Sequence, residues 1–359
     1  MISISKGSGP SVTLLVPVYN EAGILEANLK VIVDYMRQLS ANYDWELVVV
    51  NDGSEDGTAE RADAFAAAHS EVRIMHHPVN FGLGQALKTG FRAAQGEYVV
   101  TLDIDLSYAP DHIDRLLTAI RETGAKVVIA SPYMPGGTAT NVPRKRLLMS
   151  RWANRFISLV APGRIYTFTG MVRAYDGRFL KSVNLKSMGM DVNMEIIYKA
   201  TLLRARIIEI PGHLNWLSHD TNETAGATKR KSSMHVPWHT LAALFSGFVF
   251  RPFLFFFAPG FILLLLSCYV NIWICIHVVR FYQVQPEHAW FANTFSDAVR
   301  DAFQAFPHTF FIGGVTLVIA IQLLSLGFLS MQNKRYFEEL FHLTTAHYRR
   351  TIEYEEDNP

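Results

Sequence analysis

The sequence predicts an α/β fold, a Rossmann-like, mostly parallel, doubly wound sheet, followed by two transmembrane helices. Three observations predict it. Short β-branched runs alternate with stretches of helical periodicity over residues 1–232. The runs are almost continuously apolar, as in strands buried on both faces of a sheet. Two long uncharged runs then follow, and each is long enough to cross a bilayer.

The predicted strands share β-branched and apolar residues and end in turn-forming residues. Because helical patterns separate them, we expect parallel neighbours joined by helical crossovers. They cover residues 12–18, 45–50, 72–77, 97–105, 126–131 and 205–212.

The two apolar runs predict a membrane domain over residues 253–331. Residues 253–279 and 307–331 contain no Lys, Arg, Asp or Glu. A core helix of a soluble protein could be equally apolar, but helices of this length that are apolar on every face are rare in soluble folds. Two spans are therefore expected.

The charges that flank the spans predict the orientation in the membrane. Basic residues precede the first span and follow the second, whereas the loop between them carries mixed charges. By the positive-inside rule, both termini and the domain of residues 1–232 face the cytoplasm, which implies a multi-pass protein of the inner, cytoplasmic membrane. The basic residues are Lys229, Arg230, Lys231, Lys334 and Arg335.

Two flanking segments complete the predicted organisation. Residues 233–252 are uncharged up to Arg251 but are interrupted by Pro237 and contain several His and Trp residues. This pattern favours an amphipathic segment at the membrane interface, with insertion as a third span as the alternative. Residues 332–359 are expected to form a cytoplasmic tail.

Composition excludes one large class of partners. Only 18% of residues are charged and the formal net charge is +1. Nucleic-acid binding by bulk electrostatics is therefore not expected.

Four polar clusters follow predicted strands, at the edge of the sheet where ligands bind in doubly wound folds. Taken singly, each could be turn chemistry, and Asn20 or Asp56 could simply cap a helix. Their recurrence at one edge predicts a binding site. The clusters are residues 17–21 (PVYNE), 51–58 (NDGSEDGT), 80–90 (NFGLGQALKTG) and 103–107 (DIDLS).

Asp103 and Asp105 are the most specific feature of these clusters. Because strand side chains alternate between faces, both carboxylates are expected to point the same way at the end of the strand, where they repel each other unless a cation or proton intervenes. Mg²⁺ or Mn²⁺ fits, because such an ion takes one or two protein carboxylates and completes its shell with water and substrate phosphates. The pair therefore predicts a metal site and a diphosphate ligand. The alternative is a capping pair for the next helix.

Other phosphate-binding and hydrolytic schemes are not supported. The sequence contains no G-x-x-x-x-G-K-[ST], H-E-x-x-H or G-x-S-x-G string, and GLGQAL lacks the third glycine of a dinucleotide fingerprint. Gly82, Gly84 and Gly90 are instead expected to allow close backbone approach and tight helix packing.

The strings VPVYNE, NDGSEDGT, NFGLGQALKTGFRAAQGEYV and DIDL, followed by two spans, resemble family 2 glycosyltransferases of the polyprenyl-phosphate type. This group includes dolichol-phosphate mannose synthase and the bactoprenol glucosyltransferases. The resemblance covers residues 12–232 and implies a GT-A catalytic domain, a UDP- or GDP-linked sugar donor and a divalent cation. It also implies inverting transfer of the sugar to a polyprenyl phosphate at the cytoplasmic face.

The resemblance also assigns residues. We call the four clusters the donor rim; its expected nucleotide-binding residues are Pro17, Tyr19, Glu21, Asp52, Asn80, Gly82 and Asp103, with Asp103 and Asp105 at the metal. RLLMS matches an Arg-x-x-x-Ser element, which implies that Arg146 and Ser150 hold the acceptor phosphate together with Lys229. Asp103, Asp105 and Arg146 are the expected catalytic residues. An arginine suits phosphate because its planar fork binds two oxygens, although a solvated basic patch attracted to anionic lipid is the alternative for residues 144–146.

Several positions depart from the family pattern, most of them on the acceptor side, by which we mean residues 131–173 and 223–229. Pro132 stands where an arginine is usual, Tyr166 where an acid is usual, and Ser107 where a glutamine is common. A further element retains only Gly226 and Lys229. Because Pro132 replaces an arginine that is expected at the acceptor phosphate, neighbouring arginines are candidates to bind that phosphate with Arg146 or Lys229: Arg144, Arg151 and Arg173.

The acceptor decides what chemistry the protein must supply. An ionised phosphate oxygen needs no general base, so alignment and charge neutralisation suffice. A hydroxyl acceptor would need a base, for which Asp191 and Glu195 are the first candidates. A catalytically idle membrane scaffold that binds nucleotide sugars is a further alternative, and a homo-oligomer is possible.

Overall fold

The computed structural model describes residues 9–143, 147–148, 150, 154–155, 165–216, 253–284 and 291–357. The chain divides into two compact units, one formed by Met1–Leu244 with Leu340–Pro359 and the other by Phe245–Glu339. The predicted interfacial segment, residues 233–252, lies outside the described residues.

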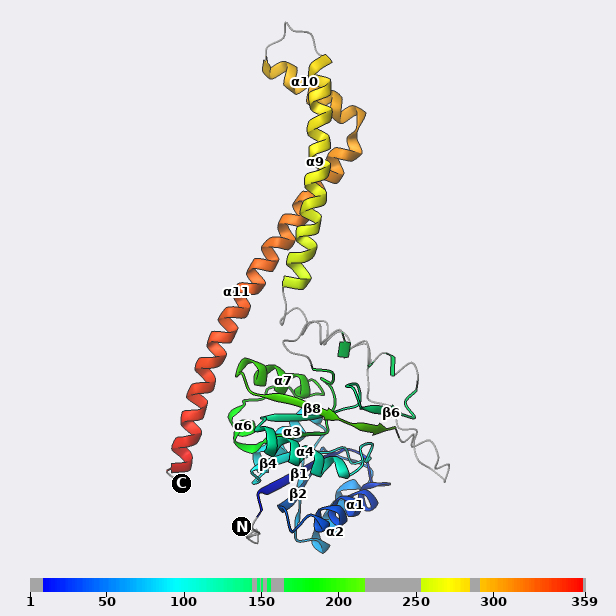
Figure 1. Cartoon of the computed structure of the whole chain (residues 1–359), viewed down its shortest axis with the longest axis vertical. Helices are drawn as coiled ribbons and strands as arrows, with labels where there is room; N and C mark the ends of the chain where they lie inside the picture. The colour runs from blue at the N-terminus through cyan, green and yellow to red at the C-terminus, as the bar shows by residue number, and fades with distance from the viewer. Residues whose placement is uncertain are drawn as a thin grey trace. The chain divides into compact units, whose positions relative to one another are not determined.

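The first unit alternates strands and helices, as the sequence pattern predicts (Figure 1). The strands are β1 (Ser11–Val18), β2 (Asp44–Asn51), β3 (Val72–His76), β4 (Tyr98–Thr101), β5 (Val127–Ser131), β6 (Thr138–Thr140), β7 (Arg173–Asp176), β8 (Ile207–Pro211) and β9 (His213–Asn215). The helices are α1 (Leu25–Gln38), α2 (Thr58–Ala68), α3 (Leu83–Ala93), α4 (Asp111–Thr123), α6 (Gly177–Ser182) and α7 (Val192–Leu202).

One sheet carries the fold, with strand order β3-β2-β1-β4-β7-β5-β8. β7 pairs antiparallel with β4 and with β5, whereas the other pairings in this sheet are parallel. The predicted mostly parallel sheet is confirmed, and a strand overlaps each of the six predicted ranges, although β4 ends at Thr101, four residues before its predicted end. The sequence pattern missed β7, because its four residues, RAYD, include two charged side chains and show no alternation.

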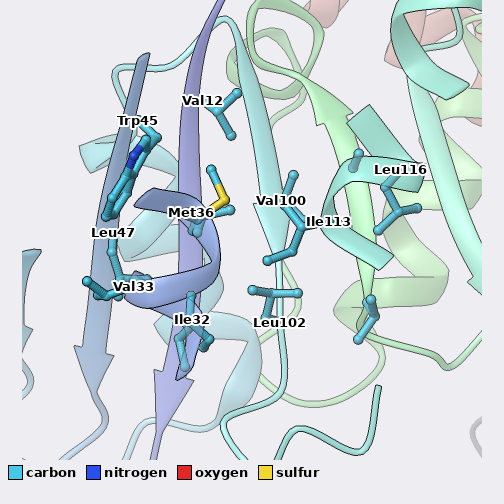
Figure 2. Packing of buried hydrophobic residues seen from close by; sticks show 14 of the residues in the cluster. Val12, Ile32, Val33, Met36, Trp45, Leu47, Val100, Leu102, Ile113 and Leu116 are labelled. Carbon is cyan, nitrogen blue, oxygen red and sulfur yellow. The ribbon is translucent and has the colours of Figure 1, made fainter. Parts of the chain in front are cut away.

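Helices cover both faces of the sheet, and each face has its own apolar core. On one face, α1 and α4 pack over β1, β2 and β4, and Figure 2 shows Met36, Ile113 and Val100 gathered there. On the other face, α3, α6 and α7 provide the covering side chains, among them Leu87 and Ile196. Burial on both faces explains why the strands are almost continuously apolar.

The second unit contains a π-helical turn, η2 (Phe253–Phe257), and the helices α9 (Ala258–Val284) and α10 (Phe291–Ala305). The helix α11 (Pro307–Asp357) begins there and runs to the end of the described chain. Phe255–Val284 and Pro307–Thr345 are long and apolar enough to cross a membrane, which fits the two predicted transmembrane helices. The sequence analysis did not foresee α10, and the residues expected as a tail continue α11 as a helix.

Hydrogen bonds between polar groups join the two candidate spans. Ser267 Oγ donates to the Gly313 carbonyl at 3.2 Å, and Asn271 Nδ2 lies 3.3 Å from the same oxygen. A Cβ at Gly313 would lie 3.0 Å from Ile274 Cδ1, so the absent side chain lets the helices approach closely. Small residues and interhelical hydrogen bonds are the usual means of packing helices in lipid.

Candidate functional site

The donor rim lies where the direction of strand succession reverses. β2 and β3 follow one another on one side of β1, and β4 lies on its other side. Ligands of doubly wound sheets bind outside the carboxyl ends of the strands at such a switch point. Tyr19 and Glu21 follow β1, and Asp103 follows β4, so the topology brings these predicted residues to the same edge.

Backbone-to-side-chain hydrogen bonds join the first two loops of the donor rim. Asn20 N–H donates to Ser54 Oγ at 2.9 Å, and Glu55 N–H donates back to Asn20 Oδ1 at 2.9 Å. Glu21 N–H donates to Thr58 Oγ1 at 2.9 Å. Asn20 has a positive φ of 55°, a conformation that asparagine tolerates better than most residues. The two motifs thus form one structural unit.

Asp56 connects the same two loops and also supports the start of α2. Its carboxylate accepts hydrogen bonds from Ala22 N–H at 3.1 Å and from Thr58 N–H at 3.1 Å. Desolvation raises the pKa of Asp56, but the hydrogen bonds from Thr58 and from Ala22 outweigh it and leave the pKa below its ordinary value. The alternative that Asp56 only caps a helix is therefore correct in part: the carboxylate accepts from the first residue of α2, but it also holds the loop after β1.

Two predicted nucleotide-binding residues of this region stay expectations. Pro17 pairs with Val50 inside the sheet, one residue before the end of β1. The next residue beyond the strand, Tyr19, is 40% exposed, so its ring is accessible to a ligand.

Asp52 is buried, and its carboxylate organises the loop after β3. Phe81 N–H donates to Oδ1 at 3.0 Å and Gly82 N–H donates to Oδ2 at 2.8 Å. His77 Nδ1 lies 2.7 Å from Oδ1, and its other ring nitrogen lies 2.9 Å from Thr89 Oγ1. The sequence analysis missed His77, which ended a predicted strand. The structure thus gives Asp52 a loop-holding function, and direct nucleotide contact stays a prediction.

Gly82 and Gly84 allow close approach of a distant loop. A Cβ at Gly82 would lie 2.8 Å from the Met188 carbonyl oxygen, and one at Gly84 would lie 2.6 Å from Ser187 O. Gly84 N–H donates to Met188 O at 2.8 Å. The predicted backbone approach is therefore seen, and the partner is residues 187–189 of this chain. Asn80 is exposed at the start of this loop.

The structure corrects the argument for Asp103 and Asp105. β4 ends at Thr101, and Asp103–Leu106 form a turn, in which Leu106 N–H donates to Asp103 O and Leu106 has a φ of 51°. Strand alternation therefore does not align the two carboxylates. Their proximity arises from this turn, in which Asp105 Oδ1 accepts from Ser107 N–H at 2.9 Å. Neither side chain caps α4.

Asp103 lies in an unusually negative environment. Desolvation, followed by the charges of Asp105 and Glu21, raises its pKa to about 7. Three carboxyl groups thus act on one another at the switch point, and a divalent cation is the partner that their repulsion favours.

Asp103 and Asp105 suit a metal ion that is shared with a nucleotide. Among the described residues, no group of three or more His, Cys, Asp or Glu side chains has the geometry of a complete metal cage. Mg²⁺ and Mn²⁺ sites that share a nucleotide do not need one, because waters and phosphate oxygens supply most ligands. Asp103 and Asp105 fit an ion of that kind.

On the acceptor side, Ser150 is the one predicted phosphate ligand that lies among the described residues; Arg146 and Lys229 lie outside them, as do Arg144 and Arg151. Ser150 Oγ lies 2.7 Å from Tyr133 Oη. Asn154 Nδ2 donates to Ser150 O at 3.0 Å, and Asn154 Oδ1 accepts from Phe168 N–H at 3.0 Å. Tyr133 and Asn154 were not foreseen, although Tyr133 directly follows the substituted Pro132.

The structure rules out Arg173 as a substitute ligand for the acceptor phosphate. Its side chain is fully buried, and its donors bind the carbonyl oxygens of Gly170, Phe168 and Asn193 at 2.7, 2.7 and 2.9 Å. A guanidinium committed to three backbone carbonyls inside the core cannot turn toward a lipid phosphate. Arg173 instead holds the loop before β7.

Glu209 of β8 holds the other side of that loop. Its carboxylate accepts from Tyr166 N–H at 2.7 Å and from Thr167 N–H at 2.8 Å. Burial raises the pKa of Glu209 despite these hydrogen bonds. Tyr166, which replaces the usual acid, is 43% exposed. The carboxylate of Glu209, from the distant strand β8, therefore lies at the loop that contains Tyr166. The sequence around Tyr166 does not predict this contact.

Glu195 is a poor candidate for a general base. It accepts hydrogen bonds from Lys186 N–H and Ser187 N–H, and Lys199 Nζ lies 2.5 Å from its Oε1. Burial raises its pKa, but these donors outweigh the burial and leave the pKa below its ordinary value. Asp191 is exposed just before α7, and its side chain makes no capping hydrogen bond to that helix.

Comparison with known proteins identifies the family of this chain. Residues 13–182 match the family described as "Glycosyl transferase family 2". Polyprenol monophosphomannose synthase of Mycolicibacterium smegmatis is 34% identical over 55% of this chain and 75% of its own length. Undecaprenyl-phosphate mannosyltransferase of Micrococcus luteus is 31% identical over 66% of this chain and 96% of its own.

A similar solved structure is the glucosyl-3-phosphoglycerate synthase of Mycobacterium tuberculosis in complex with Mn²⁺, UDP and phosphoglyceric acid. It has a TM-score of 0.49 and 20% identity, and the match covers 67% of this chain and 79% of that one. The two sequence relatives, together with the mostly parallel sheet and its donor rim, show that this chain is a glycosyltransferase that belongs to glycosyl transferase family 2 and has a GT-A-like fold.

Proposed function

We propose that this protein is a membrane-bound inverting glycosyltransferase that moves a sugar from a nucleoside-diphosphate sugar to a polyprenyl phosphate at the cytoplasmic face of the inner membrane. The observation that carries the proposal is the group of Glu21, Asp103 and Asp105 at the switch point. Burial, followed by the charges of Asp105 and Glu21, raises the pKa of Asp103 to about 7. Repulsion among the three carboxylates favours a cation that brings a diphosphate with it.

In this proposal each side of the site has a distinct task. Asp103 and Asp105 would hold Mg²⁺ or Mn²⁺, which would supply positive charge against the departing nucleoside diphosphate. Tyr19 and the backbone of the joined loops after β1 and β2 orient the nucleotide, and burial of Asp52 keeps the loop after β3 in place. Because these loops are bound to one another, little ordering is left to occur when the donor binds.

The acceptor is proposed from the names of the relatives and from the chemistry that the described side chains can supply. The relatives are named as a polyprenol monophosphomannose synthase and an undecaprenyl-phosphate mannosyltransferase. An ionised phosphate attacks without a general base, and Glu195 is already engaged by Lys199 and two backbone N–H groups. Ser150, with Arg146 and Lys229, is the proposed phosphate-binding set.

The organisation of the chain is part of the same proposal. Residues 1–232 form the catalytic domain, residues 253–331 the membrane domain, and residues 332–359 a cytoplasmic extension of α11. The positive residues around the spans support cytoplasmic termini. A reporter fused after Met331 is expected to be cytoplasmic. Labelling from the opposite side would indicate three spans, with residues 233–252 inserted as the additional one.

The central experiment is a transfer assay with the full chain in detergent. UDP- and GDP-linked hexoses are supplied with Mn²⁺ and either a polyprenyl phosphate or the corresponding polyprenol, which lacks the phosphate. We expect release of nucleoside diphosphate and a glycolipid only with the phosphate. Transfer to the polyprenol would show that the acceptor is a hydroxyl group, and Asp191 would then be the first candidate for the general base. If no sugar is transferred with any donor and acceptor, although the protein still binds the nucleotide, the result would support a catalytically idle scaffold.

Arg146→Ala tests the acceptor set separately from the donor site. A charge-assisted contact to phosphate contributes about 1.5–3 kcal/mol, so we expect a roughly tenfold to hundredfold loss in kcat/KM for the lipid with unchanged nucleotide affinity. Arg146→Lys should rescue this loss only in part, because lysine lacks the bidentate fork. An equal loss of nucleotide binding would remove Arg146 from the acceptor set.

A further inference from the structure

In the order of the chain, helix α10 comes between the two candidate spans, and it takes no part in the proposed reaction. Residues four apart lie along the same side of a helix, so they divide its surface into rows. Thr294, Ala298 and Ala302 form the buried row, with exposures of 8%, 0% and 0%. This row packs against α9, and Figure 1 shows α10 lying across α9 rather than along it.

The next row around the helix is apolar and faces outward. It consists of Phe295, Val299 and Phe303, of which Phe295 is 50% exposed and Phe303 is 40% exposed. The Phe303 ring lies 5.4 Å from that of Phe310 and 5.8 Å from that of Phe311, measured between centroids. Phe311 itself is 64% exposed on α11. The apolar surface of α10 therefore continues into the apolar surface of a candidate span.

The remaining surface of α10 is polar. Ser296, Arg300 and Gln304 are exposed in a third row, beside the apolar one. Arg300 pairs with Asp297 at 2.9 Å and with Asp301 at 3.2 Å. Going around the helix, the protein-packed, apolar and charged sectors follow one another, which is the pattern of a helix at a boundary between lipid and water.

The residues around α10 indicate its depth. Phe255–Val284 has 30 residues, about 45 Å at 1.5 Å per residue, whereas the hydrocarbon core is about 30 Å thick. The helix is thus longer than the hydrocarbon core is thick, and the end of it that precedes α10 carries amphipathic rings. There His277 stacks on Phe306 at 4.0 Å and lies 5.9 Å from Trp273. Tryptophan and other amphipathic rings collect at membrane interfaces.

We infer that α10 is an interfacial helix, which inserts the row of Phe295, Val299 and Phe303 into the leaflet at the loop end of the spans. Its partner is the lipid bilayer. Two features identify lipid as the partner: the row is continuous with the exposed apolar surface of α11, and a charged row lies beside it. It is independent of the glycosyl transfer, so failure of either proposal leaves the other intact.

Site-directed spin labelling of the full chain tests this inference. The native Cys268 and Cys275 are first replaced by alanine, and the protein is reconstituted in vesicles of phosphatidylethanolamine and phosphatidylglycerol. Two matched pairs of neighbours are then labelled: Val299→Cys with Arg300→Cys, and Phe303→Cys with Gln304→Cys. Molecular oxygen concentrates in lipid and a nickel chelate in water, so their collision rates report the depth of each label.

We expect the ratio of oxygen to nickel accessibility to be severalfold higher at 299 and 303 than at 300 and 304. Equal ratios within both pairs would overturn the inference, because the helix would then lie in water. Exclusion of both reagents at 299 and 303 would also overturn it, since protein, such as a second copy of the chain, would then cover the row. Glycosyltransferase activity of each variant checks that the labelled protein is folded.

Discussion

The donor rim and the acceptor side of this glycosyltransferase are held in place by different means. In the donor rim, the motif residues hold one another: Asn20, Asp56 and Asp52 bond to the backbone of neighbouring motif loops. On the acceptor side, residues outside the motifs hold the loops, as Glu209 does for Tyr166. A substitution in the donor rim is therefore expected to disturb several motif loops at once, whereas one on the acceptor side is expected to act more locally.

The largest effect is expected for Asp105→Asn. Asparagine keeps an oxygen that accepts from Ser107 N–H, so the turn is preserved while the negative charge is lost. Loss of a group that stabilises charge in the transition state costs roughly 10²–10³ in kcat. Steady-state kinetics with Mn²⁺ measure it, and Asp34→Asn on the exposed side of α1 is the matched control. Unchanged activity, or activity that persists in EDTA, would remove the metal from the proposal.

Asp52→Asn should lower stability and nucleotide affinity together. The amide nitrogen cannot satisfy Phe81 N–H, Gly82 N–H and His77 as the carboxylate does, and an unsatisfied buried donor costs about 1–3 kcal/mol. Thermal unfolding and nucleotide titration measure the two effects. Asp63→Asn, which removes the charge of a more exposed partner of His76, is the control and should change neither by much. A loss of affinity without a loss of stability would indicate that Asp52 contacts the nucleotide directly.

Tyr133→Phe should affect only the acceptor. It removes the hydroxyl that lies 2.7 Å from Ser150 Oγ and leaves the ring in place. A single neutral hydrogen bond contributes about 1 kcal/mol, so we expect about a fivefold rise in the apparent KM for the lipid phosphate. Nucleotide affinity, measured in the absence of lipid, should not change. Equal effects on both substrates would contradict the separation of the donor rim from the acceptor side.

The smallest effect concerns pH and the strand β9. His112 is buried, its Nδ1 lies 2.9 Å from Ala109 O, and its Nε2 accepts from His213 N–H at 3.0 Å. Desolvation lowers the pKa of His112 below its ordinary value of 6.5, so the unfolded chain takes up the proton more readily. Stability should therefore fall as pH drops below 6.5. Thermal unfolding across that range should be flatter for His112→Gln, and an identical slope would assign the effect to other groups.

Local sequence determined the elements and the composition of the donor rim. Apolar β-branched runs and helical periodicity depend on neighbouring residues, so all six predicted strands and both candidate spans are found. The short charged strand β7 and the amphipathic helix α10 were missed, because β7 is stabilised mainly by the strands beside it and α10 by the helix on which it packs.

Only the tertiary structure decided how the site is held together. Sequence alone placed Asp103 and Asp105 together by strand alternation, whereas a turn that begins two residues after β4 actually brings them near each other. The sequence also suggested Arg173 as a ligand for the acceptor phosphate. In the structure, its guanidinium is buried and donates hydrogen bonds to the backbone carbonyls of three residues. The physical reason is that burial and hydrogen-bond competition depend on segments far apart in the chain: Glu209 reaches Tyr166 across 43 residues, and no local pattern records such a contact.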